Sequence, residues 1–161
     1  MNKKPVLKKI KLVISDVDGV LTDGGMYYSA SGEHLKKFNT RDGMAVELLH
    51  SKGINVVFLT REKSDIVKAR AKKLKIDAVY LGIKTKELIL EKICKKFDVK
   101  KDQIAYVGDD INDLKIMQLV GFSACPKNGM DIIKKNSDYV CTLDGGDGVL
   151  REITEIILKN K

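Results

Sequence analysis

Short apolar runs alternate with helical segments along nearly the whole of this 161-residue chain. The apolar runs are rich in β-branched residues and end in turn residues, which predicts strands over 10–15, 54–60, 77–82, 103–110, 121–125 and 138–143. Periodicity and end signals favour helices over 41–53, 63–74, 84–97, 111–120 and 128–136, and from about residue 148 onward. This order predicts an α/β fold with a Rossmann-like parallel sheet covered by helices on both faces.

One segment departs from the alternation. Residues 24–38 contain two tyrosines, a Ser-Gly turn at 31–32 and mixed polar alternation, which indicates a β-hairpin. This hairpin is too small to be a large cap domain, so we expect it to act as a small flap. No linker or second domain is evident, and we predict a single domain over residues 1–161.

Composition argues against several classes of protein. The net charge is +8, but all but four of the 30 cationic side chains are lysines, spread along the chain with little aromatic interleaving, so nucleic acid is not the expected partner. No stretch approaches the roughly 20 apolar residues of a membrane span, and we expect a cytoplasmic protein without membrane contact. Cys94, Cys125 and Cys141 are scattered, as free thiols would be.

Polar side chains gather where the predicted strands end. Asp16 and Asp18 follow the first strand, Thr60 the second, and Asp109 and Asp110 the fourth. Lys86 opens a helix on the same side of the sheet. Ligands of such folds bind outside the carboxyl ends of the strands, so we expect these groups to converge on one site.

Converging carboxylates repel one another unless a cation meets them, and Mg²⁺ suits carboxylate oxygens. Asp16 and Asp109 are the expected ligands. Asp16 could then attack phosphorus, and Asp18 could serve as general acid and base. Thr60 and Lys86 would hold phosphoryl oxygens. Taken singly, these residues have other interpretations: an Asp turn, a strand end, a solvated lysine, or a helix cap at Asp109 and Asp110.

The chain resembles the haloacid dehalogenase-like phosphatases in four motifs: "DVDGVLTDG", Thr60, Lys86 and "GDDINDLKIM". Within them it is most similar to the 3-deoxy-D-manno-octulosonate 8-phosphate phosphatase family, which includes nonulosonate (sialic-acid-type) 9-phosphate phosphatases. The stretches "GVLTDG", "FNTRDG", "YVGDDINDL" and "GGDGVLRE" carry this similarity.

The resemblance implies a Mg²⁺-dependent phosphatase with Asp16 as nucleophile and Asp18 as acid/base. It places Mg²⁺ between the Asp16 carboxylate, the Asp18 backbone carbonyl and Asp109. Thr60 and Lys86 would bind phosphate. Asp113 would orient Lys86, and Asp110 would support the site. The family is usually a homotetramer whose hairpins and C-terminal tails complete neighbouring sites, which would bury Tyr27 and Tyr28; the alternative is that the tyrosines pack on their own domain.

The substrate class implied is a sugar-acid phosphate, but the chain departs from the octulosonate branch. That branch generally reads Thr-Gly-Arg where this chain has Thr60-Arg61-Glu62. Arg61 places a side chain beside the phosphate pocket, and Glu62 with Lys73 resembles the nonulosonate branch. Arg70 fits both branches as a partner for the sugar carboxylate. Octulosonate 8-phosphate and nonulosonate 9-phosphate therefore both remain open.

Two other interpretations are weighed. A receiver domain also uses acidic residues, Thr, Lys and Mg²⁺, but its phosphoacceptor aspartate follows the third strand, where this chain reads "YLG". A catalytically weak phosphatase-like module that only assembles or regulates a partner can lose the second aspartate. Asp18 is present here, so catalysis is expected.

Overall fold

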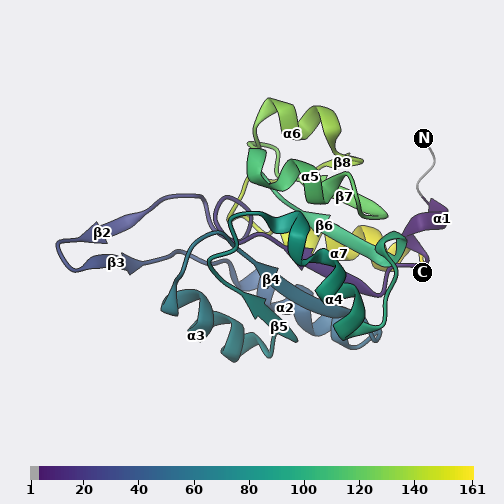
Figure 1. Cartoon of the computed structure of the whole chain (residues 1–161), viewed down its shortest axis with the longest axis horizontal. Coiled ribbons are helices and arrows are strands. Elements are labelled where there is room, and N and C mark those ends of the chain that lie inside the picture. Colours follow the sequence, from purple (N-terminus) through teal and green to yellow (C-terminus); the bar gives the residue numbers. More distant parts are fainter. Residues whose placement is uncertain (1–3) are drawn as a thin grey trace.

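The computed structural model describes residues 4–161 and contains a parallel sheet of six strands. The strands lie in the order β5 (Ala78–Tyr80), β4 (Asn55–Leu59), β1 (Leu12–Ser15), β6 (Ile104–Val107), β7 (Phe122–Cys125) and β8 (Tyr139–Val140). The chain builds outward from β1 through β4 to β5 and then returns to the other side of β1 with β6 (Figure 1). Strand order reverses there, so the carboxyl ends of β1 and β6 flank the crevice where ligands bind in such sheets.

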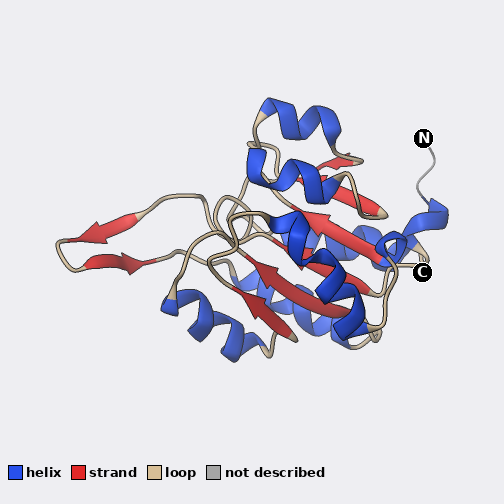
Figure 2. Ribbon diagram, in the orientation of Figure 1, coloured by secondary structure: helices blue, strands red, loops and turns tan. Residues whose placement is uncertain are grey.

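Helices cover both faces of the sheet, as the sequence predicts (Figure 2). One face is covered by the helices α2 (Thr40–His50), α3 (Asp65–Leu74) and α7 (Val149–Lys159), with the short α1 (Lys4–Leu7) beside them. On the other face lie α4 (Leu90–Phe97), α5 (Leu114–Met117) and α6 (Asp131–Asn136). Both faces are apolar because side chains alternate along each strand. In β1, Val13 belongs to the core under α2, α3 and α7, whereas Leu12 and Ile14 belong to the core under α4, α5 and α6. Within residues 4–161, no helix is both long and apolar enough to cross a membrane.

The predicted hairpin is formed by β2 (Tyr27–Ser29) and β3 (Gly32–Leu35), an antiparallel pair separate from the main sheet. It projects away from the body of the protein, at the left of Figure 1. Tyr27 and Tyr28 are 44% and 61% exposed, and Met26 and Leu35 are exposed as well. The tyrosines therefore do not pack on their own domain.

Several predicted elements are shorter in the structure. The strand expected over 103–110 ends at Val107, so Asp109 and Asp110 lie in the loop beyond it. The strand expected over 138–143 has two residues because the Thr142 and Leu143 amides donate to Glu152 instead of to a neighbouring strand. The helix expected over 111–120 starts as a tight turn, η3 (Ile111–Asp113), which Asp110 caps, and continues as α5.

The cysteines match the expectation of free thiols. Cys125 and Cys141 are buried and Cys94 is half-buried, and none forms a disulfide. Burial raises the pKa of the Cys125 and Cys141 thiols, which disfavours a reactive thiolate at either position.

Candidate active site

Asp16 directly follows β1 and is almost completely buried. Its amide donates to the Val107 carbonyl at 2.9 Å, which ties it to the end of β6. Its carboxylate is held at both oxygens: Oδ1 accepts the Val17 amide at 2.7 Å, and Oδ2 lies 2.7 Å from Lys86 Nζ. Burial and the nearby Asp113 carboxylate raise the Asp16 pKa well above its usual range, and Lys86 opposes them.

Lys86 opens the short helix η1 (Lys86–Ile89) and its side chain is fully buried. The ammonium group bridges two carboxylates, at 2.7 Å from Asp16 Oδ2 and 2.7 Å from Asp113 Oδ1. Burial alone would lower the pKa of this ammonium, but the two anions outweigh burial and raise it. Lys86 is thus a cation held between two carboxylates inside the site, unlike the many solvated lysines of the chain.

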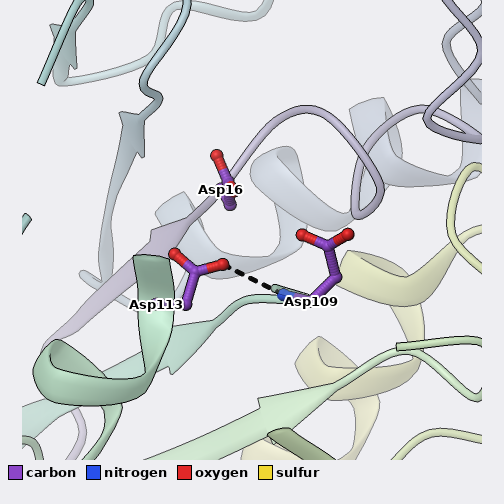
Figure 3. Close-up of side chains that lie close together, drawn as sticks. All are labelled: Asp16, Asp109 and Asp113. Carbon is purple, nitrogen blue, oxygen red and sulfur yellow. Dashed lines mark hydrogen bonds between the residues drawn. The ribbon is translucent and has the colours of Figure 1, made fainter. Parts of the chain in front are cut away.

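Asp113, at the end of η3, has both carboxylate oxygens in use. Oδ1 accepts from Lys86 and, at 2.5 Å, from the Tyr106 hydroxyl. Oδ2 accepts the backbone amides of Asp109 at 3.1 Å and Asp110 at 3.4 Å (Figure 3 shows the first). Asp113 therefore fixes both Lys86 and the loop that carries Asp109.

Asp109 turns its carboxylate toward Gly19, in the loop after β1. A Cβ atom at Gly19 would lie 2.0 Å from Asp109 Oδ2, and the Gly19 φ of +83° also disfavours a side chain. Burial, followed by the charges of Asp113 and Asp110, raises the Asp109 pKa to about 7. Asp109 is thus closely packed near other carboxylates, and the positive charge of Lys86 partly offsets the rise in its pKa.

A divalent cation would fit between these groups. Asp16, Asp109 and Asp113 each offer an oxygen, and the three oxygens lie within 4.8 Å of one another (Figure 3). Burial, followed by neighbouring carboxylates, raises the pKa of both Asp16 and Asp109, and a bound divalent cation would favour their ionised forms. Asp16 and Asp109 are the better direct ligands for a hard ion because both line the cavity over this cluster, whereas Asp113 is fully buried and not part of its lining.

A cavity of about 240 Å³ opens directly over this cluster. Thr60, at the end of β4, is buried in its wall, and its hydroxyl accepts the Glu62 amide at 3.1 Å. Arg61 and Glu62 form the exposed side of the same wall. The full lining comprises Asp16, Asp18, Gly19, Gly24, Thr60, Arg61, Glu62, Asp109, Asp110 and Asn112.

A larger cavity, of about 420 Å³, lies at the N-terminal end of α7. Arg41 and Arg151 line it, but its acidic groups are already paired. Arg151 contacts Glu155 at 2.8 Å, and Glu152 accepts hydrogen bonds from the Tyr139 hydroxyl and from residues 142 and 143. The carboxylate cluster therefore marks the smaller cavity as the candidate active site.

The C-terminal motif supports the catalytic loop. A Cβ atom at Gly145 would lie 2.0 Å from the Gly19 carbonyl oxygen, so only glycine allows these two segments to approach so closely. The Gly146 amide donates to the Val20 carbonyl at 3.0 Å, and the Asn39 side chain donates to the Gly146 carbonyl at 3.0 Å. The motifs "GGDGVLRE" and "FNTRDG" thus pack behind the loop that follows Asp16.

Arg70 and Lys73 lie outside the lining of this cavity. Arg70 donates to the Asn39 carbonyl at 3.0 Å and lies over the Phe38 ring, 5.5 Å from its centre. Lys73 is exposed on α3. Their contacts with a sugar acid remain predictions.

Three further residues of the site were not predicted from the sequence. Tyr106 points its hydroxyl at Asp113, and a tyrosine on a fully buried strand is a signal that could have identified it, since a buried hydroxyl needs a partner. Lys36 and Glu33 come from the hairpin. Lys36 Nζ lies 2.6 Å from Asp18 Oδ1 and 2.7 Å from Glu33 Oε1.

Comparisons with known proteins agree with this geometry. The family model of haloacid dehalogenase-like hydrolases matches residues 82–153. The 3-deoxy-D-manno-octulosonate 8-phosphate phosphatase KdsC of Haemophilus influenzae is 38% identical over 153 residues, which cover 95% of this chain and 85% of the relative. The crystal structure of the phosphatase of that name from Yersinia pestis superposes with a TM-score of 0.95 at 32% identity, over 99% of this chain and 86% of that one.

A third similar protein was solved with ligands. The 3-deoxy-D-manno-octulosonate 8-phosphate phosphatase from Moraxella catarrhalis was crystallised in complex with a magnesium ion, a phosphate ion and KDO. It is 36% identical to this chain with a TM-score of 0.95, and the match covers 99% of this chain and 91% of that one.

Proposed function

The chain belongs to the 3-deoxy-D-manno-octulosonate 8-phosphate phosphatase family of haloacid dehalogenase-like hydrolases, and on that premise we propose that it removes phosphate from a 3-deoxy-2-ulosonic acid phosphate through a phosphoaspartate at Asp16. Its class of reaction is the hydrolysis of phosphoric monoesters. The observation that carries the proposal is the Asp16 carboxylate, buried at the floor of the cavity and fixed by Lys86.

In the first step an Asp16 oxygen attacks phosphorus and the bond from phosphorus to the sugar oxygen breaks. The fixed orientation of Asp16 favours this step because the attacking group needs no rearrangement on binding. Mg²⁺, held by the Asp16 and Asp109 carboxylates and, as the family resemblance implies, by the Asp18 backbone carbonyl, would offset the negative charge of phosphate and carboxylates. Thr60 and Lys86 bind the phosphoryl oxygens, where negative charge spreads in the transition state.

Asp18 exchanges the proton in both steps. It protonates the sugar oxygen as the ester bond breaks, and the carboxylate then accepts a proton from water, which attacks the phosphoaspartate and releases phosphate. Its place in the wall of the cavity, two residues after Asp16, supports this role. Asp113, Tyr106 and Asp110 act indirectly by holding Lys86 and the loop of Asp109.

The first candidate substrate is 3-deoxy-D-manno-octulosonate 8-phosphate. The named activity of the relatives from Haemophilus influenzae and Yersinia pestis supports it, and so does the KDO bound to the Moraxella catarrhalis protein. A nonulosonate 9-phosphate is the second candidate because Glu62, which resembles the nonulosonate branch, lines the cavity. We expect Arg61 to contact the phosphate or sugar and Arg70 and Lys73 to reach the substrate only in the assembled protein.

We expect that assembly to be a homotetramer. The cavity is open, and the exposed Met26, Tyr27, Tyr28 and Leu35 form an apolar flap that does not cover it within one subunit. A neighbouring subunit that buried these side chains would also exclude water from the site. Sedimentation of the wild type and of a Tyr27→Ser/Tyr28→Ser variant tests this: the variant should dissociate, whereas a wild-type monomer with full turnover would contradict it.

The deciding experiment compares kcat/KM in Mg²⁺ for octulosonate 8-phosphate, nonulosonate 9-phosphates and common hexose phosphates. We expect an ulosonic acid phosphate to exceed every hexose phosphate by at least about 100-fold, because a site that pairs with a carboxylate rejects a substrate lacking it. Equal rates on hexose phosphates would contradict the substrate class. A long-lived phosphoaspartate without turnover would instead favour a receiver-like phosphoacceptor, and no phosphorylation at all would favour an assembly module.

A further inference from the structure

We propose that Lys36 is a positioning residue that ties down one carboxylate oxygen of Asp18 and thereby reserves the other oxygen for proton transfer. Lys36 directly follows strand β3, so this role gives the flap a part in the chemistry as well as in the proposed assembly. The inference concerns the proton-transfer step and does not depend on which sugar acid is the substrate.

The burial of Lys36 is the first observation. Its side chain is 1% exposed, whereas the side chain of the adjacent Lys37 is 61% exposed. A buried ammonium group is costly unless it is paired, and here it contacts Asp18 Oδ1 at 2.6 Å and Glu33 Oε1 at 2.7 Å. The ammonium group therefore lies between two carboxylates that compensate its charge.

The second observation is the asymmetry of the Asp18 carboxylate. Oδ1 is held by Lys36, whereas Oδ2 is buried and has no hydrogen-bond partner among residues 4–161. A general acid carries its proton on an oxygen that does not already accept from a charged donor. With Oδ1 occupied by a donor, only Oδ2 can carry that proton.

The third observation is that the partner of Lys36, Glu33, is itself held by the segment that follows β4. The second Glu33 oxygen accepts a hydrogen bond from the Ser64 hydroxyl, and Ser64 caps α3, just after the loop of Thr60, Arg61 and Glu62. The chain of contacts Ser64–Glu33–Lys36–Asp18 therefore joins the flap, the phosphate-binding loop and the proton donor. Such a support fixes the Asp18 side chain more firmly than a single contact would.

This role has a specific kinetic consequence. As the bond from Asp16 to phosphorus forms, the bond from phosphorus to the leaving oxygen breaks, and that oxygen takes the proton from Asp18 Oδ2. A weakly basic leaving group such as p-nitrophenolate departs without the proton, whereas phenolate needs it more. A misplaced Asp18 should therefore slow phenyl phosphate far more than p-nitrophenyl phosphate.

The test measures kcat/KM of the Mg²⁺-loaded protein for these two esters, because kcat/KM reports only the steps up to departure of the leaving group. For Lys36→Met we expect a loss of about 100-fold with phenyl phosphate and of about threefold with p-nitrophenyl phosphate. Lys36→Arg should restore most of the loss. Lys37→Met, which removes the exposed neighbour, should match the wild type.

Equal losses on the two esters, or none, would overturn the proposal, since a purely structural role slows both alike. If Lys36→Met does not fold, Glu33→Gln provides the test. It leaves Lys36 in place but weakens its support, so kcat/KM should again fall more for phenyl phosphate than for p-nitrophenyl phosphate, by a smaller factor. The inference rests on the proposed role of Asp18. The proposed substrate is tested separately, by the rate of the wild type on octulosonate 8-phosphate, because the two aryl esters carry no information about the sugar.

Discussion

Lys86 Nζ lies 2.7 Å from Asp16 Oδ2, so a lysine that opens η1 directly contacts the carboxylate that follows β1. A fully buried cation here does two things at once. It fixes the orientation of Asp16, and in the proposed function it also supplies a positive charge to the phosphoryl group.

Replacing Lys86 by methionine should therefore damage both catalysis and stability. We expect kcat/KM to fall by at least about 100-fold, as when a preorganised donor is removed. The free energy of unfolding should fall by about 3 kcal/mol because Asp16 and Asp113 lose their shared partner. Steady-state kinetics and urea unfolding measure the two effects. Lys84→Met, at an exposed position, is the control, and an equally active Lys86→Met would contradict the assignment.

Tyr106→Phe tests the support behind Lys86. Loss of the hydroxyl removes one hydrogen bond to Asp113 Oδ1, so we expect kcat to fall about tenfold while the fold persists. Tyr139→Phe removes a tyrosine hydrogen bond to Glu152, away from the site, and should cost at most about 1 kcal/mol of stability with unchanged kcat. Similar kinetics for the two variants would show that Asp113 needs no support from Tyr106.

Gly19→Ala should abolish activity by displacing Asp109. The new Cβ would lie 2.0 Å from Asp109 Oδ2, in addition to the strain of a positive φ. Gly53→Ala is the matched control because Gly53 also has a positive φ, +67°, but a Cβ there meets nothing within 4 Å. Both variants should lose about 1 kcal/mol of stability to backbone strain, but only Gly19→Ala should lose affinity for Mg²⁺. Calorimetric titration with Mg²⁺ distinguishes them.

Binding of Mg²⁺ should release protons near neutral pH. The Asp109 pKa is raised to about 7 without the ion, so near pH 7 this carboxyl is partly protonated and must lose its proton to bind metal. The apparent affinity for Mg²⁺ should therefore rise with pH and level off once the pH is well above 7. Titrations in two buffers of different ionisation enthalpy at pH 7 measure the protons released. No proton release, with affinity independent of pH between 6 and 8, would contradict the setting of Asp109.

Much of the fold could be predicted from the sequence because the alternation of apolar strands and helices has few other solutions. The convergence of Asp16, Asp109 and Lys86 also followed, since the carboxyl ends of parallel strands share one edge. Lys36 could not be found in this way. Lys36 and Lys37 are identical neighbours, and only the path of the returning hairpin decides that one is buried against Asp18 and the other is exposed.

The ends of elements were the other weak point. Hydrogen bonds between side chains and the backbone set these ends, and the side chain can come from another element of the chain. The Glu152 carboxylate of α7 accepts hydrogen bonds from the Thr142 and Leu143 amides and so ends the last strand early. Hydrophobic periodicity contains no information about such a contact.

The central claim is that Asp16 carries the phosphoryl group. It is tested most directly by mixing the Asp18→Asn variant with p-nitrophenyl phosphate and Mg²⁺, quenching in acid and mapping the phosphorylated peptide by mass spectrometry. The p-nitrophenolate departs without a proton as the phosphoryl group passes to Asp16, whereas hydrolysis of the adduct needs Asp18, so the adduct should accumulate. We predict one phosphoryl group on Asp16 and none in an Asp16→Asn/Asp18→Asn variant. A phosphoryl group on another residue, or wild-type turnover by folded Asp16→Asn, would contradict the account.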